Sequence, residues 1–243
     1  MNDIWSLLTR RHNPALPLVT YVDADDGSRT ELSGISVANA AAKIANALVM
    51  EFDAEPGTRI ALSLPWHWQR ATWLGGIWAS GCIAVVDEDQ FTSCDLVVTD
   101  ERCCSRMLQL GCGDVLAVSL HPFGLPITVG LPDGSRDVTI DVRNQPDALL
   151  VGGQFADAAA LTIEGKTLSQ DQVLDAAEDL ATLWSIAHGS RVLAAAADLN
   201  PQSEWIAPLA LPLRIDGSVL MAEVFSAELA AGEGATARSR PPQ

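Results

Sequence analysis

The sequence predicts an α/β protein with layered, largely parallel β-sheets flanked by helices. Strand-like and helix-like hydrophobic periods alternate along most of the chain. Residues 59–86 read as a strand, a helix and a second strand, which is the unit of a parallel sheet. Of the 243 residues, 48% are apolar and 19% are charged, enough to bury a large core. We expect one folded unit over residues 1–228, with two subdomains at about 1–145 and 146–228.

The first half of the chain has the clearer periodicity. Val37, Ala41, Ile44 and Leu48 form the apolar stripe of an amphipathic helix, for which Ser36 is the predicted N-cap. The elements predicted up to residue 100 are a helix at 4–10, a hairpin of strands at 18–22 and 29–32, a helix at 36–50, a strand at 59–64, a helix at 67–80, and strands at 82–86 and 96–99.

The second half alternates less clearly. Residues 169–172 form a capping box that begins a helix, and Gly189 closes that unit. The predicted strands are 115–119, 138–142, 148–151, 159–163 and 191–195. Residues 229–243 are small, polar and proline-rich, so we expect a disordered tail there.

The charge balance excludes one class of partner. Lysine and arginine number 15 against 31 acidic residues, a net charge of −16, and no segment supplies the basic face that nucleic acids require. Arg10 and Arg11 follow the first apolar patch instead of preceding it, so no secretory signal is predicted and we expect a cytoplasmic protein. The longest uncharged run, residues 71–86, is too short to span a membrane and predicts buried core.

The cysteines and histidines predict no metal site. The five cysteines, an odd number without a C-x-x-C pair, indicate reduced thiols in the cytosol, and zinc is not expected. They are Cys82, Cys94, Cys103, Cys104 and Cys112. The histidines are separated from one another and from any patterned carboxylate, so each is interpreted as a surface or core residue. They are His12, His67, His121 and His188.

Three glycine-containing motifs do not complete a known site. The run 111–113 begins like a dinucleotide fingerprint, but Leu116 stands where its third glycine belongs. The run 34–38 resembles a nucleophile elbow, but a true elbow follows a strand and needs a histidine after an acid, so Ser36 is interpreted as a helix N-cap. The run 165–167 lacks the first glycine of a phosphate loop, since position 160 is alanine, and is interpreted as a hairpin turn. No catalytic, cofactor-binding or metal-binding residue is predicted.

The order of the segments points to a family. The most specific piece is PGTRIALSLP from Pro56, followed by an aromatic-rich helix, a glycine and an apolar strand. With the preceding hairpin and helix, CDLVVTD from Cys94, and the later stretch that begins at Gly189, it resembles the amino-terminal region of the AMP-forming adenylating enzymes. This superfamily includes acyl-CoA synthetases, luciferases and peptide-synthetase adenylation domains. The chain also resembles a small actinobacterial group of short relatives of these enzymes.

The resemblance implies ATP-dependent formation of an acyl-adenylate, but the residues for it are missing. The family's phosphate loop should follow Val151, where this chain has GGQFADAAA from Gly152. Two glycines remain, whereas the hydroxyl donors, the proline and the lysine are absent. Residues 144–190 carry seven acidic residues and one lysine, which disfavours a polyphosphate. The sequence also lacks the family's later nucleotide-binding motifs and its small carboxy-terminal domain. No cofactor is therefore expected.

Three functions follow from these observations. The first is a non-catalytic relative of the adenylating enzymes that acts by binding a protein or small molecule. The second is half of a split ATP-dependent carboxylate-adenylating ligase, completed by a partner chain. The third is a binder of an acyl or aromatic molecule, with the clustered tryptophans either lining a pocket or forming plain core. They are Trp66, Trp68, Trp73 and Trp78. We also expect a protein partner or self-association, because the incomplete fold should expose an apolar face.

Overall fold

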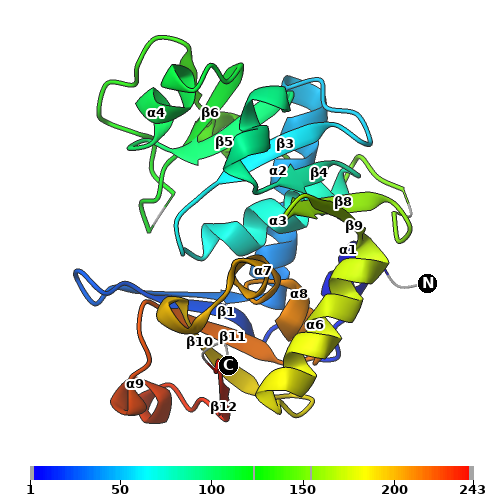
Figure 1. Ribbon diagram of the computed structural model, residues 1–243, viewed down its shortest axis with the longest axis vertical. Coiled ribbons are helices and arrows are strands. Elements are labelled where there is room, and N and C mark those ends of the chain that lie inside the picture. The colour runs from blue at the N-terminus through cyan, green and yellow to red at the C-terminus, as the bar shows by residue number, and fades with distance from the viewer. Residues whose placement is uncertain (1–2, 123, 154, 241–243) are drawn as a thin grey trace.

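The computed structural model describes residues 3–122, 124–153 and 155–240, which form two mixed β-sheets with helices around and between them (Figure 1). The strand order is β12-β10-β11-β1-β2 in the five-stranded sheet and β7-β6-β5-β3-β4-β8-β9 in the seven-stranded sheet. All neighbouring strands are parallel except the pairs β1–β2 and β8–β9. The α/β fold class with largely parallel sheets is confirmed.

The seven-stranded sheet is built from the middle of the chain. Its strands are β3 (Arg59–Ser63), β4 (Ile83–Val85), β5 (Leu96–Asp100), β6 (Asp114–Val118), β7 (Ser135–Asp137), β8 (Ala159–Ile163) and β9 (Lys166–Ser169). Four of its central strands, β3, β4, β5 and β8, are almost wholly buried, which explains their continuous apolar runs. The turn at Gly165 joins β8 to β9, as the hairpin interpretation predicted.

The five-stranded sheet joins the two ends of the chain. Its strands are β1 (Pro17–Val22), β2 (Arg29–Ser33), β10 (Arg191–Ala195), β11 (Ser218–Ala222) and β12 (Ala237–Arg238). The first hairpin therefore pairs with the strand β11, 200 residues later, through Val19 opposite Val219. The expected subdomains, at about 1–145 and 146–228, do not coincide with the two sheets for this reason.

Helices fill the space beside and between the sheets. They are α1 (Ile4–Thr9), α2 (Gly34–Glu51), α3 (Gln69–Ala79), α4 (Cys104–Gln109), α5 (Thr139–Arg143), α6 (Gln170–Trp184), α7 (Pro201–Ile206), α8 (Ala210–Arg214) and α9 (Ala227–Gly232), with 3₁₀ turns at Glu88–Ser93 and Ala196–Asp198. Figure 1 shows α7 and α8 between the two sheets, and one hydrophobic core extends through both.

Every residue of α3 is buried, which confirms that the long uncharged run is core. This helix packs closely on α2, because Gly75 and Gly76 face Ala41 and Ile44 with no room for a Cβ at Gly76. Within the described ranges, no helix combines the length and apolar character needed to cross a membrane.

Four predictions of local structure differ from what is observed. Where a strand was predicted at 138–142, the structure has the helix α5 over Thr139–Arg143, and residues 148–151 form no strand. The N-cap of α2 is Ser33, whose Oγ accepts from the backbone N–H of Ser36, so the predicted cap lies three residues too late. The expected disordered tail contains most of α9 and all of β12, although residues 241–243 lie outside the described part of the chain.

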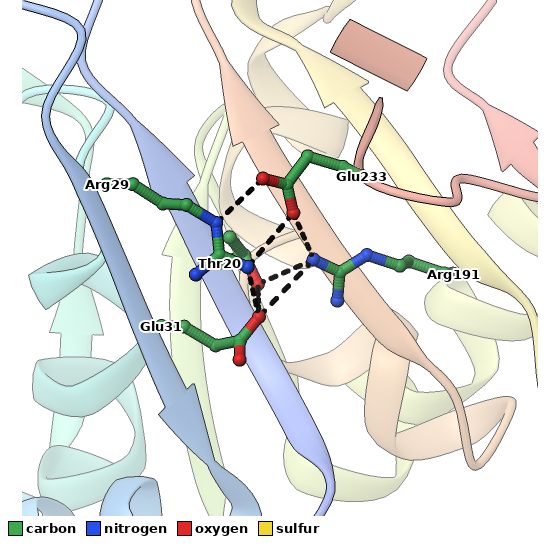
Figure 2. Close-up of polar contacts among 5 residues, drawn as sticks. All are labelled: Thr20, Arg29, Glu31, Arg191 and Glu233. Carbon is green, nitrogen blue, oxygen red and sulfur yellow. Dashed lines mark hydrogen bonds and ion pairs between the residues drawn. The ribbon is translucent and has the colours of Figure 1, made fainter. Parts of the chain in front are cut away.

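An ionic cluster holds this carboxy-terminal segment in place (Figure 2). Glu233, just after α9, accepts hydrogen bonds from Arg29 Nε at 2.7 Å and from Arg191 Nη2 at 2.8 Å. Arg191 Nη2 also donates to Thr20 Oγ1 at 3.0 Å, and Arg29 pairs with Glu31. Strands β1, β2 and β10 are thereby joined to the end of α9, which explains why the segment is ordered.

The capping box at the start of α6 is confirmed. Ser169 Oγ accepts from the backbone N–H of Gln172, and Gln172 Oε1 accepts from that of Ser169. The five cysteines are all unbridged thiols, as expected.

Candidate functional site

The carboxyl ends of strands from both sheets meet at one crevice of about 770 Å³, here called the polar crevice. Strands β1, β10 and β11 of one sheet end there, as do β3, β5 and β6 of the other. Ligands of open α/β proteins bind at this edge of a sheet. The lining residues are Tyr21, Val22, Asp23, Ala24, Asp25, Asp26, Ser28, Thr30, Pro65, Trp66, His67, Arg70, Arg102, Leu120, Pro122, Ala196, Glu204 and Glu223.

Arg70 forms the floor of the polar crevice and is only 5% exposed. Its Nε donates to the carbonyl oxygen of Leu64 at 2.8 Å, and its Nη1 to Glu204 Oε1 at 2.7 Å. The guanidinium lies 4.1 Å from the ring centroid of Trp205, within cation–π distance. Because its charge is paired and its plane is covered, Arg70 links α3 to α7 and is a structural part of the crevice.

Tyr21 and His67 are in edge-to-face contact on one wall, with ring centroids 4.8 Å apart. The hydroxyl of Tyr21 donates to Asp23 Oδ2 at 3.1 Å, and burial, this hydrogen bond and nearby carboxylates raise the pKa of the phenol. Burial lowers the pKa of His67 from 6.5 to about 4, so the imidazole is neutral at pH 7. His67 is the histidine that joins this site.

A second cavity of about 270 Å³ lies beside the crevice at the same edge of the seven-stranded sheet, and is here called the apolar cavity. Its lining residues are Ala40, Lys43, Ile44, Trp68, Gln69, Thr72, Trp73, Val118, Ser119, Gly124, Val138, Thr139, Val142 and Arg143. The segment from Pro65 to Gln69 separates the two spaces, with Trp66 and His67 lining the crevice and Trp68 and Gln69 lining the cavity.

Two hydrogen-bond donors of the apolar cavity lack a protein acceptor. The indole Nε1 of Trp68 is buried and has no partner among the described residues. The guanidinium of Arg143 likewise makes no hydrogen bond or ion pair with the described part of the chain. Lys43, by contrast, is held by Asp147 at 3.0 Å and by two backbone carbonyl oxygens. Trp68 Nε1 is closed off by protein, whereas Arg143 is exposed, so an arginine beside apolar walls is what the cavity offers to a small molecule with an apolar body and an acidic group.

The four clustered tryptophans divide between pocket and core. Trp66 lines the polar crevice, and Trp68 and Trp73 line the apolar cavity. Trp78 is 1% exposed and donates from Nε1 to the carbonyl oxygen of Ala160 at 2.8 Å, so it is core. Trp66, Trp73 and Trp78 all belong to the buried hydrophobic core, which confirms the core interpretation for these three. That the cluster binds an acyl or aromatic molecule stays a prediction.

The stretch from Gly152, which stands where the family's phosphate loop belongs, lies at the opposite edge of the seven-stranded sheet from the polar crevice. Residues 152–153 and 155–158 precede β8, which runs parallel to β4, so they lie at the amino ends of these strands. Phe155 packs against Gly81, just before β4, where a Cβ would come within 2.7 Å of the ring. The stretch therefore lies apart from the polar crevice, which is formed at the carboxyl ends. Gln154 is outside the described residues.

The helix that follows offers no amide to a phosphate. The N–H groups of Gln170 and Asp171 donate to the carbonyl oxygens of Ala158 and Ala156, at 3.1 and 3.0 Å. Those of Ser169 and Gln172 are used in the capping box. The first amides of a helix have no partner within the helix, and in other proteins such amides bind anions. In α6, all four of them have partners elsewhere in the chain.

No site residue was predicted from the sequence, and Tyr21, His67, Arg70 and Arg143 were not singled out. The signal that could have found the first three is positional, because residues just after parallel strands gather at one edge. Among the described histidines, cysteines, aspartates and glutamates, no three are placed to hold a metal ion.

The fold is that of the amino-terminal region of AMP-forming acyl-CoA synthetases, which confirms the expected resemblance at the level of fold. An acyl-CoA synthetase from Brucella canis superposes on 97% of this chain with a TM-score of 0.78 and 15% identity. ATP-bound MatB from Rhodopseudomonas palustris superposes on 98% with a TM-score of 0.69 and 16% identity. The chain covers 46% and 48% of these two proteins, about half of their length.

A curated protein of Mycobacterium tuberculosis, described as a TIGR03089 family protein, is similar in sequence. It is 37% identical over 150 residues, which are 58% of this chain and 58% of that protein. No protein-family model matches the chain.

Proposed function

We propose that this chain is a non-catalytic relative of the AMP-forming acyl-adenylating enzymes, and that it binds a small acyl or aromatic molecule in the apolar cavity. The observation that carries the proposal is the pairing of every amide at the start of α6 with Ala156, Ala158 or the capping box. A phosphate bound there would have to displace these bonds, and the adjoining segment, with seven acidic residues and one lysine, would repel it.

The apolar cavity supports the binding half of the proposal. Trp68 and Trp73 supply aromatic walls, while the unpaired guanidinium of Arg143 suits a carboxylate. A volume of about 270 Å³ restricts the occupant to a small acid, such as a benzoate or a medium-length fatty acid.

Pyrophosphate exchange and tryptophan fluorescence test the two halves separately. The purified protein should not exchange pyrophosphate into ATP with any carboxylic acid, and exchange would overturn the non-catalytic reading. Aromatic or fatty acids should change the emission of Trp68 and Trp73 saturably. Arg143→Gln should weaken binding about tenfold, the effect of one charge-assisted hydrogen bond.

Arg10→Gln is the matched control, because it removes one exposed arginine with no contact to the cavity. Ala40→Leu should abolish binding by filling the cavity. Two outcomes would contradict the assignment of the apolar cavity. One is saturable binding of an acid to the Ala40→Leu variant, and the other is the absence of saturable binding of any tested acid to the unaltered protein.

The second candidate is half of a split ATP-dependent carboxylate-adenylating ligase. Its support is the superposition of 98% of this chain on ATP-bound MatB. A partner chain would then supply the nucleotide-binding groups. This function predicts that Mg-ATP raises the melting temperature, since a ligand at a hundred times its Kd adds about 2.7 kcal/mol. If Mg-ATP leaves the melting temperature unchanged, both for the chain alone and for the chain with any partner that co-purifies with it, this function would be contradicted.

A protein partner or self-association accompanies either function. Leu16 and Ile35 are large exposed apolar residues on adjoining segments, since Gly34 N–H donates to the Leu16 carbonyl oxygen. Sedimentation analysis at micromolar concentration should show a dimer or a bound protein, and a monodisperse monomer would oppose it.

A further inference from the structure

A cleft of about 640 Å³ lies where residues 226–240, here called the carboxy-terminal strap, meet the five-stranded sheet. It is here called the arginine cleft, and its walls include Arg29 of β2, Arg191 of β10, Ser218 of β11 and Glu233 of the strap. Arg191 and Ser218 are register partners on neighbouring parallel strands, so their side chains leave the same face of the sheet side by side.

The carboxylate of Glu233 lies in this cleft as a bound carboxylic acid would (Figure 2). Its Oε1 accepts from Arg29 Nε at 2.7 Å, and its Oε2 accepts from Arg29 Nη2 at 3.0 Å and from Arg191 Nη2 at 2.8 Å. Guanidinium groups from two strands thus hold both oxygens of one carboxylate, which is a geometry that recognises carboxylates.

The strap that carries Glu233 is held loosely near this residue. Helix α9 has six residues, none of them buried, and its apolar contacts with the sheet come from partly buried side chains. Farther along, the N–H of Thr236 donates to the Arg191 carbonyl oxygen at 2.9 Å, and that of Ser239 donates to the Leu193 carbonyl oxygen at 2.7 Å. Glu233 can therefore leave the cleft while the end of the strap stays bound to β10.

Ser218 is the second observation that points to a ligand. The residue is 9% exposed, and its hydroxyl forms no hydrogen bond with any residue that the structure describes. The Nε of Arg191 is closed off by protein, whereas the Ser218 hydroxyl is open to the cleft. A hydroxyl buried to this extent normally has a partner within the protein, so Ser218 offers a donor to an oxygen of a bound molecule.

The charges of the arginine cleft favour a ligand with one negative charge. Its charged side chains are three arginines and three acids, so the cleft is balanced while Glu233 occupies it. They are Arg11, Arg29, Glu31, Arg191, Asp216 and Glu233. When Glu233 leaves, one positive charge is in excess, and a single carboxylate restores the balance.

We propose that the arginine cleft binds a small monocarboxylic acid that also carries a hydroxyl or carbonyl oxygen, and that Glu233 is the internal competitor for this site. The carboxylate of the acid takes the place of Glu233 between Arg29 and Arg191, and the Ser218 hydroxyl donates to the second oxygen. Binding frees the end of α9. The arginine cleft shares no lining residue with the apolar cavity, so the proposal stands or falls independently of the proposed function.

Calorimetric titration at constant ionic strength tests the ligand class. The probes are 2-, 3- and 4-hydroxybutyrate, butyrate, which lacks the hydroxyl, and butane-1,4-diol, which lacks the carboxylate. One of the hydroxybutyrates should bind tightest, butyrate about fivefold more weakly, the effect of one lost hydrogen bond, and the diol not at all.

Glu233→Gln should tighten the binding of the hydroxybutyrates about tenfold, because it removes the competitor. Glu228→Gln removes the same charge from an exposed position on the same helix and should change binding less than twofold. Equal tightening by both variants would show general charge repulsion and overturn the proposal. So would the absence of saturable binding to the Glu233 variant at about 10 mM, where a Kd of about 1 mM gives near-complete occupancy.

Two further variants test the groups that hold the ligand. Ser218→Ala should bring the tightest hydroxybutyrate down to the affinity of butyrate without changing butyrate. Arg29→Gln should weaken both acids about tenfold, whereas Arg214→Gln, at an exposed arginine paired with Glu178, should leave them unchanged. Equal affinities of the hydroxybutyrates and butyrate for the unaltered protein would remove the role of Ser218.

Hydrogen exchange tests the displacement of Glu233. With saturating hydroxybutyrate, exchange of the unaltered protein should accelerate at the amides of Ala235 and Thr236, which are bonded to the carbonyl oxygens of Ala230 and Arg191. Binding at an unrelated site would not loosen this segment. Slower or unchanged exchange at both amides would show that the acid binds without displacing Glu233, and would overturn the proposal.

Discussion

Arg191 and Glu233 are joined by an ion pair with Nη2 2.8 Å from Oε2, between side chains that are each 16% exposed. Arg29 approaches the other oxygen of the same carboxylate at 2.7 Å (Figure 2). Two glutamates, Glu31 and Glu233, therefore balance the two arginines, and Glu233 connects the end of α9 to β2 and β10 of the five-stranded sheet. Beyond it, Thr236 N–H donates to the Arg191 carbonyl oxygen and Ser239 N–H to that of Leu193.

Glu233→Gln should loosen the carboxy-terminal segment. It removes the charge shared by Arg29 and Arg191, and we expect a loss of about 1–3 kcal/mol, because the pair is largely buried. Hydrogen exchange should accelerate at the amides of Thr236 and Ser239. Glu228→Gln, an exposed acid on the same helix, should change stability by less than about 0.5 kcal/mol. Unchanged exchange at Thr236 in the Glu233 variant would show that β12 is held without the cluster.

This cluster shows why the tail was wrongly predicted. Its composition is that of a disordered segment, yet Glu233 finds its partners 42 and 204 residues earlier in the chain. Sequence patterns report only neighbours within a helix turn or a strand, so such pairs cannot be anticipated. The elements that were predicted correctly, such as α2, β3 and α6, have their apolar period or cap within a few residues.

The two wrongly predicted strands have the same cause. The alternation Val138, Ile140, Val142 is typical of a strand, but Asp137 Oδ1 accepts from the Thr139 N–H and the segment packs as a helix on α2. Residues 148–151 bond to the side chain of Asn46 instead of a neighbouring strand. Tertiary contacts override local propensity in both.

The candidate site was beyond sequence reasoning for a geometric reason. The polar crevice is formed by the ends of strands from both sheets, and which ends meet depends on strand order. The missing phosphate-loop residues could be read directly, because that motif is contiguous. The paired amides of α6 and the contact between the rings of Tyr21 and His67 became visible only in three dimensions.

His67 should make the protein less stable as the pH falls from 6.5 to 4. Burial lowers its folded-state pKa to about 4, so the unfolded chain binds the extra proton first and unfolding is favoured across this window. The fall in pKa from 6.5 corresponds to a loss on the order of 3 kcal/mol. Urea unfolding at a series of pH values measures it.

His67→Gln provides the reference for this titration, because it removes the titrating ring. The difference in unfolding free energy between the two proteins should shrink between pH 6.5 and 4. Glu233 does not interfere, since hydrogen bonds from its arginine partners lower its pKa and its contribution is lost only at the acid end of the range. A pH-independent difference would mean that burial does not lower the pKa of His67 in the folded state.

Gly81→Ala should destabilise the chain by two separable effects. Gly81 has φ +77°, which strains any L-residue, and its Cβ would lie 2.7 Å from Cε1 of Phe155. Gly57, with φ +92° and open space around it, reports the backbone effect alone. We expect Gly57→Ala to cost about 1 kcal/mol and Gly81→Ala about 2–4 kcal/mol in thermal or urea unfolding.

Adding Phe155→Ala to Gly81→Ala tests the contact itself. If the clash is real, the double variant should recover part of the loss, because the ring that blocks the new Cβ is gone. If the losses of unfolding free energy of the two single variants simply add, then Phe155 does not contact Gly81 in solution. The segment around Phe155 would then not lie beside the start of β4.

Asn46→Ala should release the segment that leads into the stretch beginning at Gly152. The side chain is fully buried on α2, donates from Nδ2 to the carbonyl oxygens of Pro146 and Ala148, and accepts from the Leu150 N–H at 2.9 Å. Its removal leaves three backbone groups without partners, so we expect a loss of about 2–4 kcal/mol. Asn39→Ala, on the same helix and without a side-chain hydrogen bond to the described chain, should be neutral or slightly stabilising. Limited proteolysis should then cleave the Asn46 variant between residues 146 and 158, and cleavage equal to that of the Asn39 variant would show that Asn46 does not anchor this segment.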